Sequence, residues 1–307
     1  MLNISTSSPS KNPPYPVILL FGPTGVGKTD LLSRECSRGY EVISADSMQV
    51  YRGLDIGTAK PEQNLLDTIK HHLIDIRDPH EQFHVGDFVP LADELIGSIN
   101  RRGRIPVVSG GTAFYFKHLL YGLPETPPAD PQVREQVQKE LDAYGLEELY
   151  RRLEHVDPRS ACSISSRDAY RVIRALEVFY TSGHPLSSFR MPRQVRSFIA
   201  PVVIGLYRER EELSARIEGR VDMMMQQGLY DEVRSLIARG AQAHWPGMKG
   251  IGYREFFIYQ SLGEYSLPGI ARLITANSRT YAKQQMTFFR SLPHVQWVHP
   301  DEVCLSQ

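Results

Sequence analysis

Eight consecutive residues near the start of the chain have the types and the spacing of a phosphate-binding loop. They match the pattern G-x-x-x-x-G-K-[ST] and are Gly22, Pro23, Thr24, Gly25, Val26, Gly27, Lys28 and Thr29. The glycines let successive backbone N–H groups turn inward around phosphate oxygens, and the start of the following helix adds a partial positive charge. Lys28 supplies a point charge, and we expect the Thr29 hydroxyl to hold Mg²⁺. The loop therefore predicts a site that binds phosphate groups.

The residues around this loop do not supply the aspartate that organises Mg²⁺ in most ATP-hydrolysing proteins. That aspartate follows a nearby apolar strand, whereas the apolar run Ile105–Val108 continues into Ser109 and Gly110. The nearest alternative is Asp75, which follows only a short apolar run. The loop alone would predict ATP as the ligand, and the missing aspartate weakens that prediction.

Three expected strands end at polar or glycine-rich loops. Val17–Phe21 leads into the phosphate-binding loop, Glu41–Ser44 ends beside Asp46, and Ile105–Ser109 ends at a Gly-Gly pair. In open α/β sheets, ligands bind beyond the carboxyl ends of the strands. We therefore expect the three loops to converge on one site.

The alternation of strands and helices predicts an α/β fold, a P-loop NTPase-like parallel sheet with flanking helices, plus an inserted all-helical subdomain. Prolines after residue 123 interrupt the α/β pattern, and the apolar run Val202–Leu206 indicates a return to the sheet. We therefore expect a flexible tail at 1–16, a catalytic core at 17–123 and 201–307, and a helical insertion at 124–200. The expected helices are Asp30–Arg38, one from about Thr112, Pro131–Tyr144, Leu146–Glu154, Ala169–Thr181, Glu211–Gln227, Tyr230–Arg239, Arg254–Leu262 and Pro268–Arg290.

The composition excludes several classes of protein. No apolar run approaches the roughly 20 residues that a membrane-spanning helix needs, so we expect no membrane partner. Cys36, Cys162 and Cys304 fit neither a disulfide framework nor a zinc site, which favours a cytoplasmic location. Acidic side chains outnumber basic ones in residues 1–150, and the reverse holds in residues 151–307. The basic second half is compatible with a polyanionic partner.

Six motifs along the chain resemble, in the same order, those of the tRNA dimethylallyltransferases, also called isopentenyl-tRNA transferases or the IPP transferase family. The resemblance covers nearly the whole chain. The absence of CxxC and His spacing indicates the bacterial type, which lacks the zinc finger of eukaryotic members. The motifs are the phosphate-binding loop, Ser44–Tyr51 continuing through Asp55–Pro61, Gly110–Tyr115, Arg171–Tyr180, Lys249–Arg254 and Lys283–Arg290.

The resemblance implies a prenyl transfer. The family moves a dimethylallyl group from dimethylallyl diphosphate to N6 of adenine 37 in the tRNA anticodon loop. The resemblance assigns the role of catalytic base to Asp46. It places Thr112 and Arg220 at the diphosphate leaving group and implies Mg²⁺ as the cofactor. These residue types suit the reaction. A carboxylate can accept the proton that N6 must lose, and a hydroxyl and a guanidinium can stabilise the negative charge that grows on diphosphate. We expect the enzyme to be a monomer.

The resemblance also implies that a set of residues binds the RNA. We expect the reacting adenine to leave its stack when the RNA binds. One motif departs from the family pattern: Gln284 and Phe288 replace the usual Arg and Trp. The expected RNA-binding residues are Asp46, Ser47, Met48, Gln49, Thr112, Arg134, Tyr170, Arg171, Val172, Ile173, Arg174, Lys249, Gly250, Ile251, Gly252, Tyr253, Arg254, Lys283 and Arg290.

Two other functions are compatible with a phosphate-binding loop. A P-loop kinase or an adenylate isopentenyltransferase would act on a small nucleotide, but it would leave the helical insertion and the basic C-terminal motifs without a role. An RNA-binding module that uses the loop only as a switch would bind RNA without transferring a prenyl group.

Overall fold

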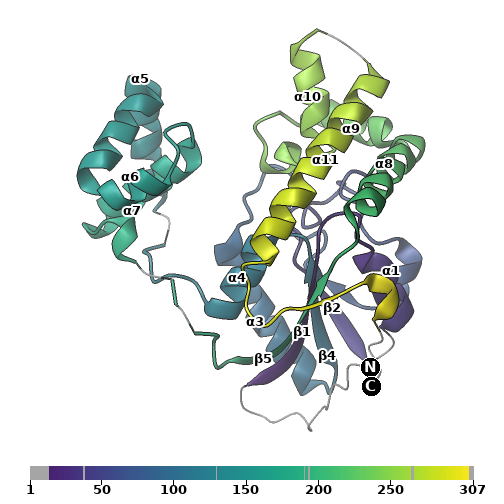
Figure 1. Ribbon diagram of the computed structural model, residues 1–307. Helices are drawn as coiled ribbons and strands as arrows, with labels where there is room; N and C mark the ends of the chain where they lie inside the picture. The colour runs from purple at the N-terminus through teal and green to yellow at the C-terminus, as the bar shows by residue number, and fades with distance from the viewer. Residues whose placement is uncertain are drawn as a thin grey trace. The chain divides into compact units, whose positions relative to one another are not determined.

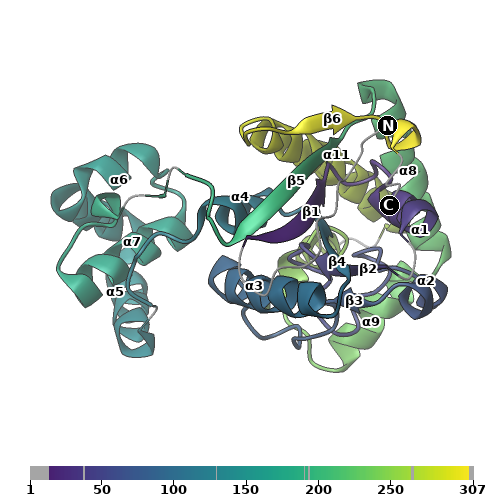
Figure 2. The same cartoon turned by 90° about the horizontal axis from the view of Figure 1, so that it is seen from below.

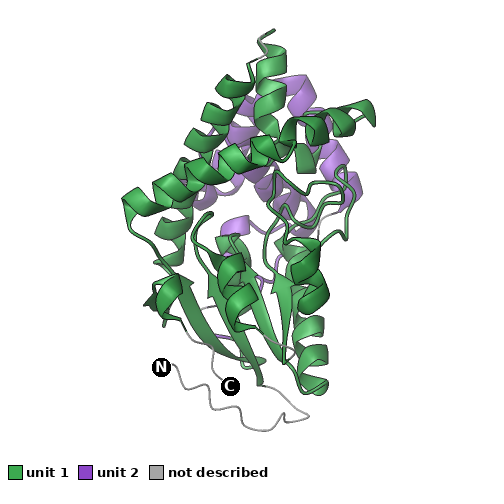
Figure 3. Ribbon diagram, turned by 90° about the vertical axis from the view of Figure 1, so that its right-hand side faces the viewer, with its two compact units in different colours: residues 1–120, 196–307 green, residues 121–195 purple. Residues whose placement is uncertain are grey.

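The structure is a computed structural model that describes residues 14–36, 39–128, 130–189, 191–192, 194–263 and 266–303. Most of the predicted tail and Cys304 lie outside the described residues. The chain forms two compact units, one from the residues up to 120 together with those from 196 onward, and one from residues 121–195 (Figure 3). The helical insertion was predicted at 124–200, so its observed limits lie a few residues earlier.

The first unit contains one parallel sheet of six strands in the order β3-β2-β4-β1-β5-β6. The predicted α/β fold with a parallel sheet is confirmed. The four longer strands match the predicted ones, whereas two short strands were not predicted because two or three residues show no periodicity. The strands are β1 (Tyr15–Phe21), β2 (Tyr40–Ser44), β3 (His71–His72), β4 (Ile105–Gly110), β5 (Ile199–Leu206) and β6 (Gln296–Val298).

The register of the central strands brings the predicted loops together. At their carboxyl ends, Phe21 of β1 pairs with Gly110 of β4, and Ser44 of β2 pairs with Ser109 of β4. The phosphate-binding loop after β1, the Asp46 loop after β2 and the Gly110–Gly111 loop after β4 therefore start from one edge of the sheet (Figure 1). The predicted convergence of these three loops is confirmed.

Helices cover both faces of the sheet (Figure 2). Alternate residues of a strand point to opposite faces, so Ile18 and Leu20 of β1 pack with Leu31 and Leu32 on one side. On the other side, Phe21 stacks on Phe289 with ring centroids 4.4 Å apart. Burial on both faces explains why the central strands are continuously apolar rather than alternating.

The helices of the first unit agree closely with the predicted ones, except that α2 and the long α3 were not anticipated. Pro90 lies inside α3, and a proline at an interior position usually argues against a helix. The sequence pattern therefore did not indicate this helix. Among the described helices, none combines the length and the apolar character needed to cross a membrane. The helices are α1 (Lys28–Glu35), α2 (Gln63–Thr68), α3 (Val85–Arg101), α4 (Ala113–Tyr121), α8 (Arg210–Gln226), α9 (Leu229–Ala238), α10 (Arg254–Ser261) and α11 (Leu267–Phe289), with short 3₁₀ helices at Pro246–Lys249 and Pro300–Glu302.

The second unit is all-helical and has its own apolar core, as predicted for an inserted subdomain. Its helices are α5 (Pro131–Val156), α6 (Pro158–Ser163) and α7 (Ala169–Ser182), followed by a 3₁₀ turn at Leu186–Ser188. The core includes Val137, Leu153, Val172 and Leu176. Two helices were predicted where α5 runs, and Gly145 at that junction has a non-helical φ of 78°, so α5 is kinked at the expected break.

Candidate active site

The last two residues of the phosphate-binding loop, Lys28 and Thr29, are the first two residues of α1. Gly27 caps this helix with a left-handed φ of 104°, a conformation that favours glycine. The Lys28 Nζ atom donates hydrogen bonds to the carbonyls of Gly22 at 2.9 Å and Pro23 at 3.0 Å. Among the described residues, none accepts a hydrogen bond from the backbone N–H of Gly25 or Gly27. The loop therefore offers backbone donors and a cation to an anion.

A second cation, Arg220, reaches this loop from α8. Its Nη1 atom donates to the Thr24 hydroxyl at 2.9 Å. Burial lowers the pKa of Arg220, and burial together with the Arg220 charge lowers the pKa of Lys28 to about 8. The negative charge of Asp46 opposes both shifts. Two half-buried cations, of which Arg220 disfavours the charged form of Lys28, make a favourable position for an anion.

The contacts around the loop distinguish Arg220 from Arg216, which lies four residues earlier on α8. Arg216 donates to the Gly25 carbonyl and pairs with Asp30 at 3.0 Å. Within the described part of the chain, no carboxylate lies within ion-pair distance of Lys28 or Arg220. Arg220 rather than Arg216 is therefore the guanidinium available to a ligand.

The Asp46 carboxylate lies in a tight turn after β2. Its Oδ1 atom accepts hydrogen bonds from the backbone N–H of Met48 at 2.8 Å and Gln49 at 3.4 Å. No described residue donates a hydrogen bond to its Oδ2 atom. One oxygen thus orients the carboxylate, while the other is available to a proton.

Thr112 joins the loop after β4 to the loop that carries Asp46. Its hydroxyl accepts a hydrogen bond from the Ser47 backbone N–H at 2.9 Å and donates to the Ser47 hydroxyl at 3.3 Å. Gly110 packs so closely on Ala45 that an added Cβ would lie 2.2 Å from the Ala45 carbonyl oxygen. The two loops are therefore in direct backbone contact, and they place Thr112 beside Asp46.

The Gln49 amide is occupied within the protein. Its Oε1 atom accepts from the Ser44 hydroxyl at 3.1 Å, and its Nε2 atom donates weakly to the carbonyls of Thr58 and Ala59 at 3.4 and 3.3 Å. These long contacts hold the following loop near Gln49. The expected contact of Gln49 with a base edge stays a prediction.

Comparisons with known proteins agree on one family. The protein-family model described as "IPP transferase" matches residues 49–292. The chain belongs to the IPP transferase family. It is 42% identical over 286 residues to the tRNA dimethylallyltransferase of Borrelia turicatae, covering 93% of this chain and 95% of that one. It is 45% identical over 287 residues to the tRNA dimethylallyltransferase of Syntrophobacter fumaroxidans, covering 92% and 83% respectively.

Solved structures of IPP transferases have the same fold. The tRNA isopentenylpyrophosphate transferase of Bacillus halodurans is 39% identical, with a TM-score of 0.65 and coverage of 92% of this chain and 89% of that one. A eukaryotic dimethylallyltransferase described as acting on tRNA is 26% identical, with a TM-score of 0.76 and coverage of 92% and 74%. The sequence resemblance and the predicted fold class are thereby confirmed.

The sequence patterns missed an anchor that holds the loop after Gln49 in this IPP transferase. The Glu232 carboxylate on α9 accepts hydrogen bonds from three successive backbone N–H groups and from the Tyr253 hydroxyl, the latter at 2.6 Å. An isolated Glu on an amphipathic helix gives no motif signal, so the sequence could not reveal it. The N–H donors are those of Asp55, Ile56 and Gly57.

We expect this anchor to contribute to stability. Replacing Glu232 with alanine leaves several loop donors and the buried Tyr253 hydroxyl without their acceptor, so the free energy of unfolding should fall by about 1–3 kcal/mol. Urea denaturation followed by circular dichroism measures this change. The control is Glu211→Ala on the exposed first turn of α8, and equal stability of both variants would contradict the anchoring role.

The expected RNA-binding residues fall into two groups by exposure. Tyr170 and Arg171 on α7 are exposed, and so are Lys249, Arg254, Lys283 and Arg290 in the first unit. The side chains of Val172 and Tyr253 are fully buried. The residues of the second group are buried or half-buried, namely Asp46, Ser47, Met48, Gln49, Thr112, Arg134, Val172, Ile173, Arg174, Gly250, Ile251, Gly252 and Tyr253.

The half-buried arginines of the insertion have a partner within the protein. Arg134 and Arg174 both pair with the buried carboxylate of Glu177, at 2.7 and 3.4 Å. Arg174 also donates to the Pro127 carbonyl at 2.9 Å. These contacts fix both guanidinium groups, and their RNA contacts stay predictions together with those of the other residues in the set.

The chemistry of the loop fits a magnesium ion held mainly by phosphate. Thr29 is exposed in the first turn of α1, and Mg²⁺ commonly uses one or two protein ligands together with phosphate oxygens and water. In the described residues, no three His, Cys, Asp or Glu side chains form a metal cluster.

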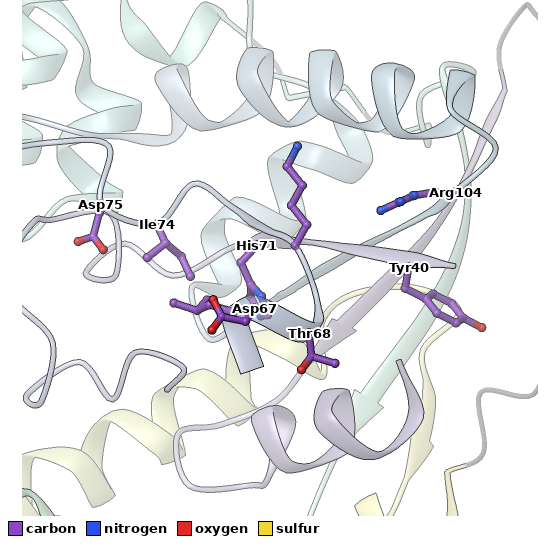
Figure 4. A pocket seen from close by; sticks show the side chains of 9 residues that line it. Tyr40, Asp67, Thr68, His71, Ile74, Asp75 and Arg104 are labelled. Carbon is purple, nitrogen blue, oxygen red and sulfur yellow. The ribbon is translucent and has the colours of Figure 1, made fainter. Parts of the chain in front are cut away.

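The alternative ligand Asp75 belongs to a different feature of the fold. It lines a pocket at the edge of the sheet together with Tyr40, His71 and Arg104 (Figure 4). Its carboxylate pairs with Lys60 Nζ at 2.5 Å. Because Lys60 occupies this carboxylate, Asp75 is a poor candidate for the second magnesium ligand.

The lowered pKa of Lys28 predicts how anion binding depends on pH. A bound diphosphate favours the ammonium form, so binding raises this pKa from about 8. Affinity should therefore be full below pH 8 and fall as the pH rises above it, with proton uptake on binding. Calorimetry of a saturated alkyl diphosphate in buffers of different ionisation enthalpy at pH 8.5 measures this uptake. The same proton uptake by Lys28→Met would exclude Lys28 as the group that takes up the proton.

Proposed function

We propose that this chain transfers a dimethylallyl group from dimethylallyl diphosphate to N6 of adenine 37 in the tRNA anticodon loop. The products are N6-(dimethylallyl)adenosine and diphosphate. The observation that carries the proposal is the pair of half-buried cations near Asp46, Lys28 and Arg220, which have no carboxylate partner among the described residues. The names of the relatives support the same reaction, since they are called tRNA dimethylallyltransferases.

The cationic side of the site suits the leaving group. As the carbon–oxygen bond of the allylic diphosphate breaks, the carbon becomes partly cationic and negative charge grows on diphosphate. Lys28, Arg220 and the free amides of Gly25 and Gly27 are already oriented, so they stabilise that charge without reorganising. The Thr112 hydroxyl is a further donor if its long bond to Ser47 is exchanged for one to the bridging oxygen.

The Asp46 side of the site suits the acceptor. The adenine N6 amine attacks the allylic carbon, a nitrogen–carbon bond forms, and the proton leaves N6. The free Oδ2 oxygen of Asp46 accepts that proton, while the turn bonds to Oδ1 hold the carboxylate in place. The bond formed, the bond broken and the proton released account for all the atoms of the reaction.

Mg²⁺ is proposed as the cofactor, held by the Thr29 hydroxyl and diphosphate oxygens. When bound, it neutralises part of the negative charge on diphosphate. The protein residues bind and orient the substrate around it. Omission of divalent cations should therefore weaken diphosphate binding as well as turnover.

The RNA partner is proposed to be tRNA, bound by a monomer in the cytoplasm. Tyr170 and Arg171 are exposed on the insertion, and Lys249, Arg254, Lys283 and Arg290 are exposed on the first unit. An aromatic ring can stack on an unpaired base, and the cations can contact phosphates. Affinity for the anticodon stem-loop should fall with rising salt, because phosphate contacts release counterions.

The experiment that tests this function offers two acceptors. The protein is incubated with radiolabelled dimethylallyl diphosphate, Mg²⁺ and either AMP or an anticodon stem-loop with an adenine at position 37. Label in the stem-loop alone supports the proposal. Label in AMP would instead support an adenylate isopentenyltransferase, and RNA binding without any transfer would support an RNA-binding module.

A further inference from the structure

A buried glutamine on α11 spans two of the three loops at the site. The Gln285 Oε1 atom accepts a hydrogen bond from the Thr24 backbone N–H at 2.9 Å, and its Nε2 atom donates to the Gly111 carbonyl at 2.7 Å. The side chain is only 4% exposed. One amide therefore ties the phosphate-binding loop to the loop after β4, although these residues are far apart in the sequence.

Each residue that this amide contacts is directly bonded to, or hydrogen-bonded to, a residue with a role in the proposed reaction. On one side, the Thr24 hydroxyl accepts from Arg220, the residue proposed to bind the diphosphate. On the other side, Gly111 precedes Thr112, whose hydroxyl accepts from the backbone N–H of Ser47, the residue after Asp46. Gln285 therefore lies between the half of the site that holds the leaving group and the half that holds the acceptor.

The position of Gln285 on its helix is fixed by packing. Phe289, four residues later on the same face, stacks on Phe21, and Phe21 directly precedes the phosphate-binding loop. Phe289 is completely buried. The helix therefore cannot slide relative to β1 without breaking this contact, and the amide has little freedom to move.

Only an amide satisfies both loops at this point. A glutamate would direct a carboxylate oxygen at the Gly111 carbonyl, and a methionine would leave both the Thr24 N–H and the Gly111 carbonyl without a partner. An added Cβ on Gly111 would lie 2.5 Å from the Gln285 Nε2 atom, so glycine is required for the amide to approach. The contact is therefore specific in both its partners.

We propose that Gln285 is a positioning residue for the transfer reaction. It sets the distance between the diphosphate held by the phosphate-binding loop and the adenine held beside Asp46 and Thr112. This inference rests on the proposed function. Because a misplacement of about 1 Å costs roughly 100-fold in rate, loss of the amide should slow the chemical step while each substrate still binds.

The test uses two variants that disturb the same contact from opposite sides. Gln285→Met removes the amide, and Gly111→Ala displaces it while leaving it in the chain. Both should reduce the single-turnover rate of transfer by about 100-fold, with dissociation constants for an alkyl diphosphate and for the stem-loop changed less than about fivefold. The double variant should be no slower than the slower single variant, because both act on one interaction.

Two controls separate positioning from general stability. Thr275→Val removes a buried hydroxyl from the same helix, where it bonds only the Ala271 carbonyl of its own turn. Gly219→Ala adds a methyl group where no atom lies within 4 Å. Both should transfer at the wild-type rate, even if Thr275→Val lowers the melting temperature.

The outcomes distinguish failure of this inference from failure of the proposed function. If the wild-type protein transfers the label and both Gln285→Met and Gly111→Ala match its single-turnover rate, the positioning role is excluded. If Gln285→Met does not fold, Gly111→Ala decides the question alone. A wild-type protein that transfers nothing to RNA would overturn the proposed function itself, whatever the variants do.

Discussion

Replacing Asp46 with asparagine is expected to slow transfer by about 10²–10⁴-fold. An amide oxygen can still accept the turn bonds from Met48 and Gln49, so the loop keeps its shape. It cannot accept the proton that leaves N6. Single-turnover kinetics with saturating RNA and dimethylallyl diphosphate measure the loss.

The binding of both substrates to Asp46→Asn should remain within a few-fold of wild type. Asp46→Ala is the companion variant, because it also removes the turn bonds and should therefore weaken RNA binding in addition. Near-normal turnover of Asp46→Asn would exclude Asp46 as the base. Equal RNA affinities of the two variants would indicate that the turn is not needed to hold the acceptor.

Replacing Arg220 with methionine is expected to slow the chemical step by about 10²–10³-fold. The half-buried guanidinium donates to Thr24 and has no described carboxylate partner, so its charge is available to the ligand. Because charge grows on diphosphate as the bond breaks, the loss should be larger in rate than in diphosphate affinity. Single-turnover rates and calorimetric dissociation constants provide the two quantities.

The matched control for this prediction is Arg210→Met. Arg210 is exposed at the start of the same helix, so its removal changes the net charge without touching the phosphate-binding loop. Arg220→Met should also raise the pKa of Lys28, because the Arg220 charge contributes to lowering it. If Arg220→Met had the same single-turnover rate as Arg210→Met, Arg220 would have a structural role and no role in the chemical step.

The parts of the fold that follow from local patterns were predictable. The sequence specifies the start of the fold within a few residues. An apolar strand run predicts β1, the glycines that follow predict a turn, and the helical pattern after them predicts α1. The polar residues after β2 and β4 also indicated where the site would form, because parallel strands end at one edge. The insertion was visible through its prolines and its helical period, and Gly145 marked the kink in α5.

The parts that depend on tertiary contacts could not be predicted. Glu232 and Gln285 act through hydrogen bonds to distant backbone groups, and nothing in their neighbouring residues indicates those partners. The Tyr253 hydroxyl donates to Glu232 and its ring is buried against Gly57, while its expected contact with the RNA stays a prediction. A motif reveals that a residue matters to the family, whereas only the structure reveals whether it faces a ligand or supports a loop.

The most direct test of the central claim is mass spectrometry of nucleosides from tRNA. The protein is mixed with dimethylallyl diphosphate, Mg²⁺ and bulk tRNA that lacks the modification, and the RNA is then digested to nucleosides. We predict N6-(dimethylallyl)adenosine in the wild-type reaction and its loss in the Asp46→Asn reaction. Unmodified adenosine in the wild-type reaction, or equal product from both proteins, would contradict this prediction.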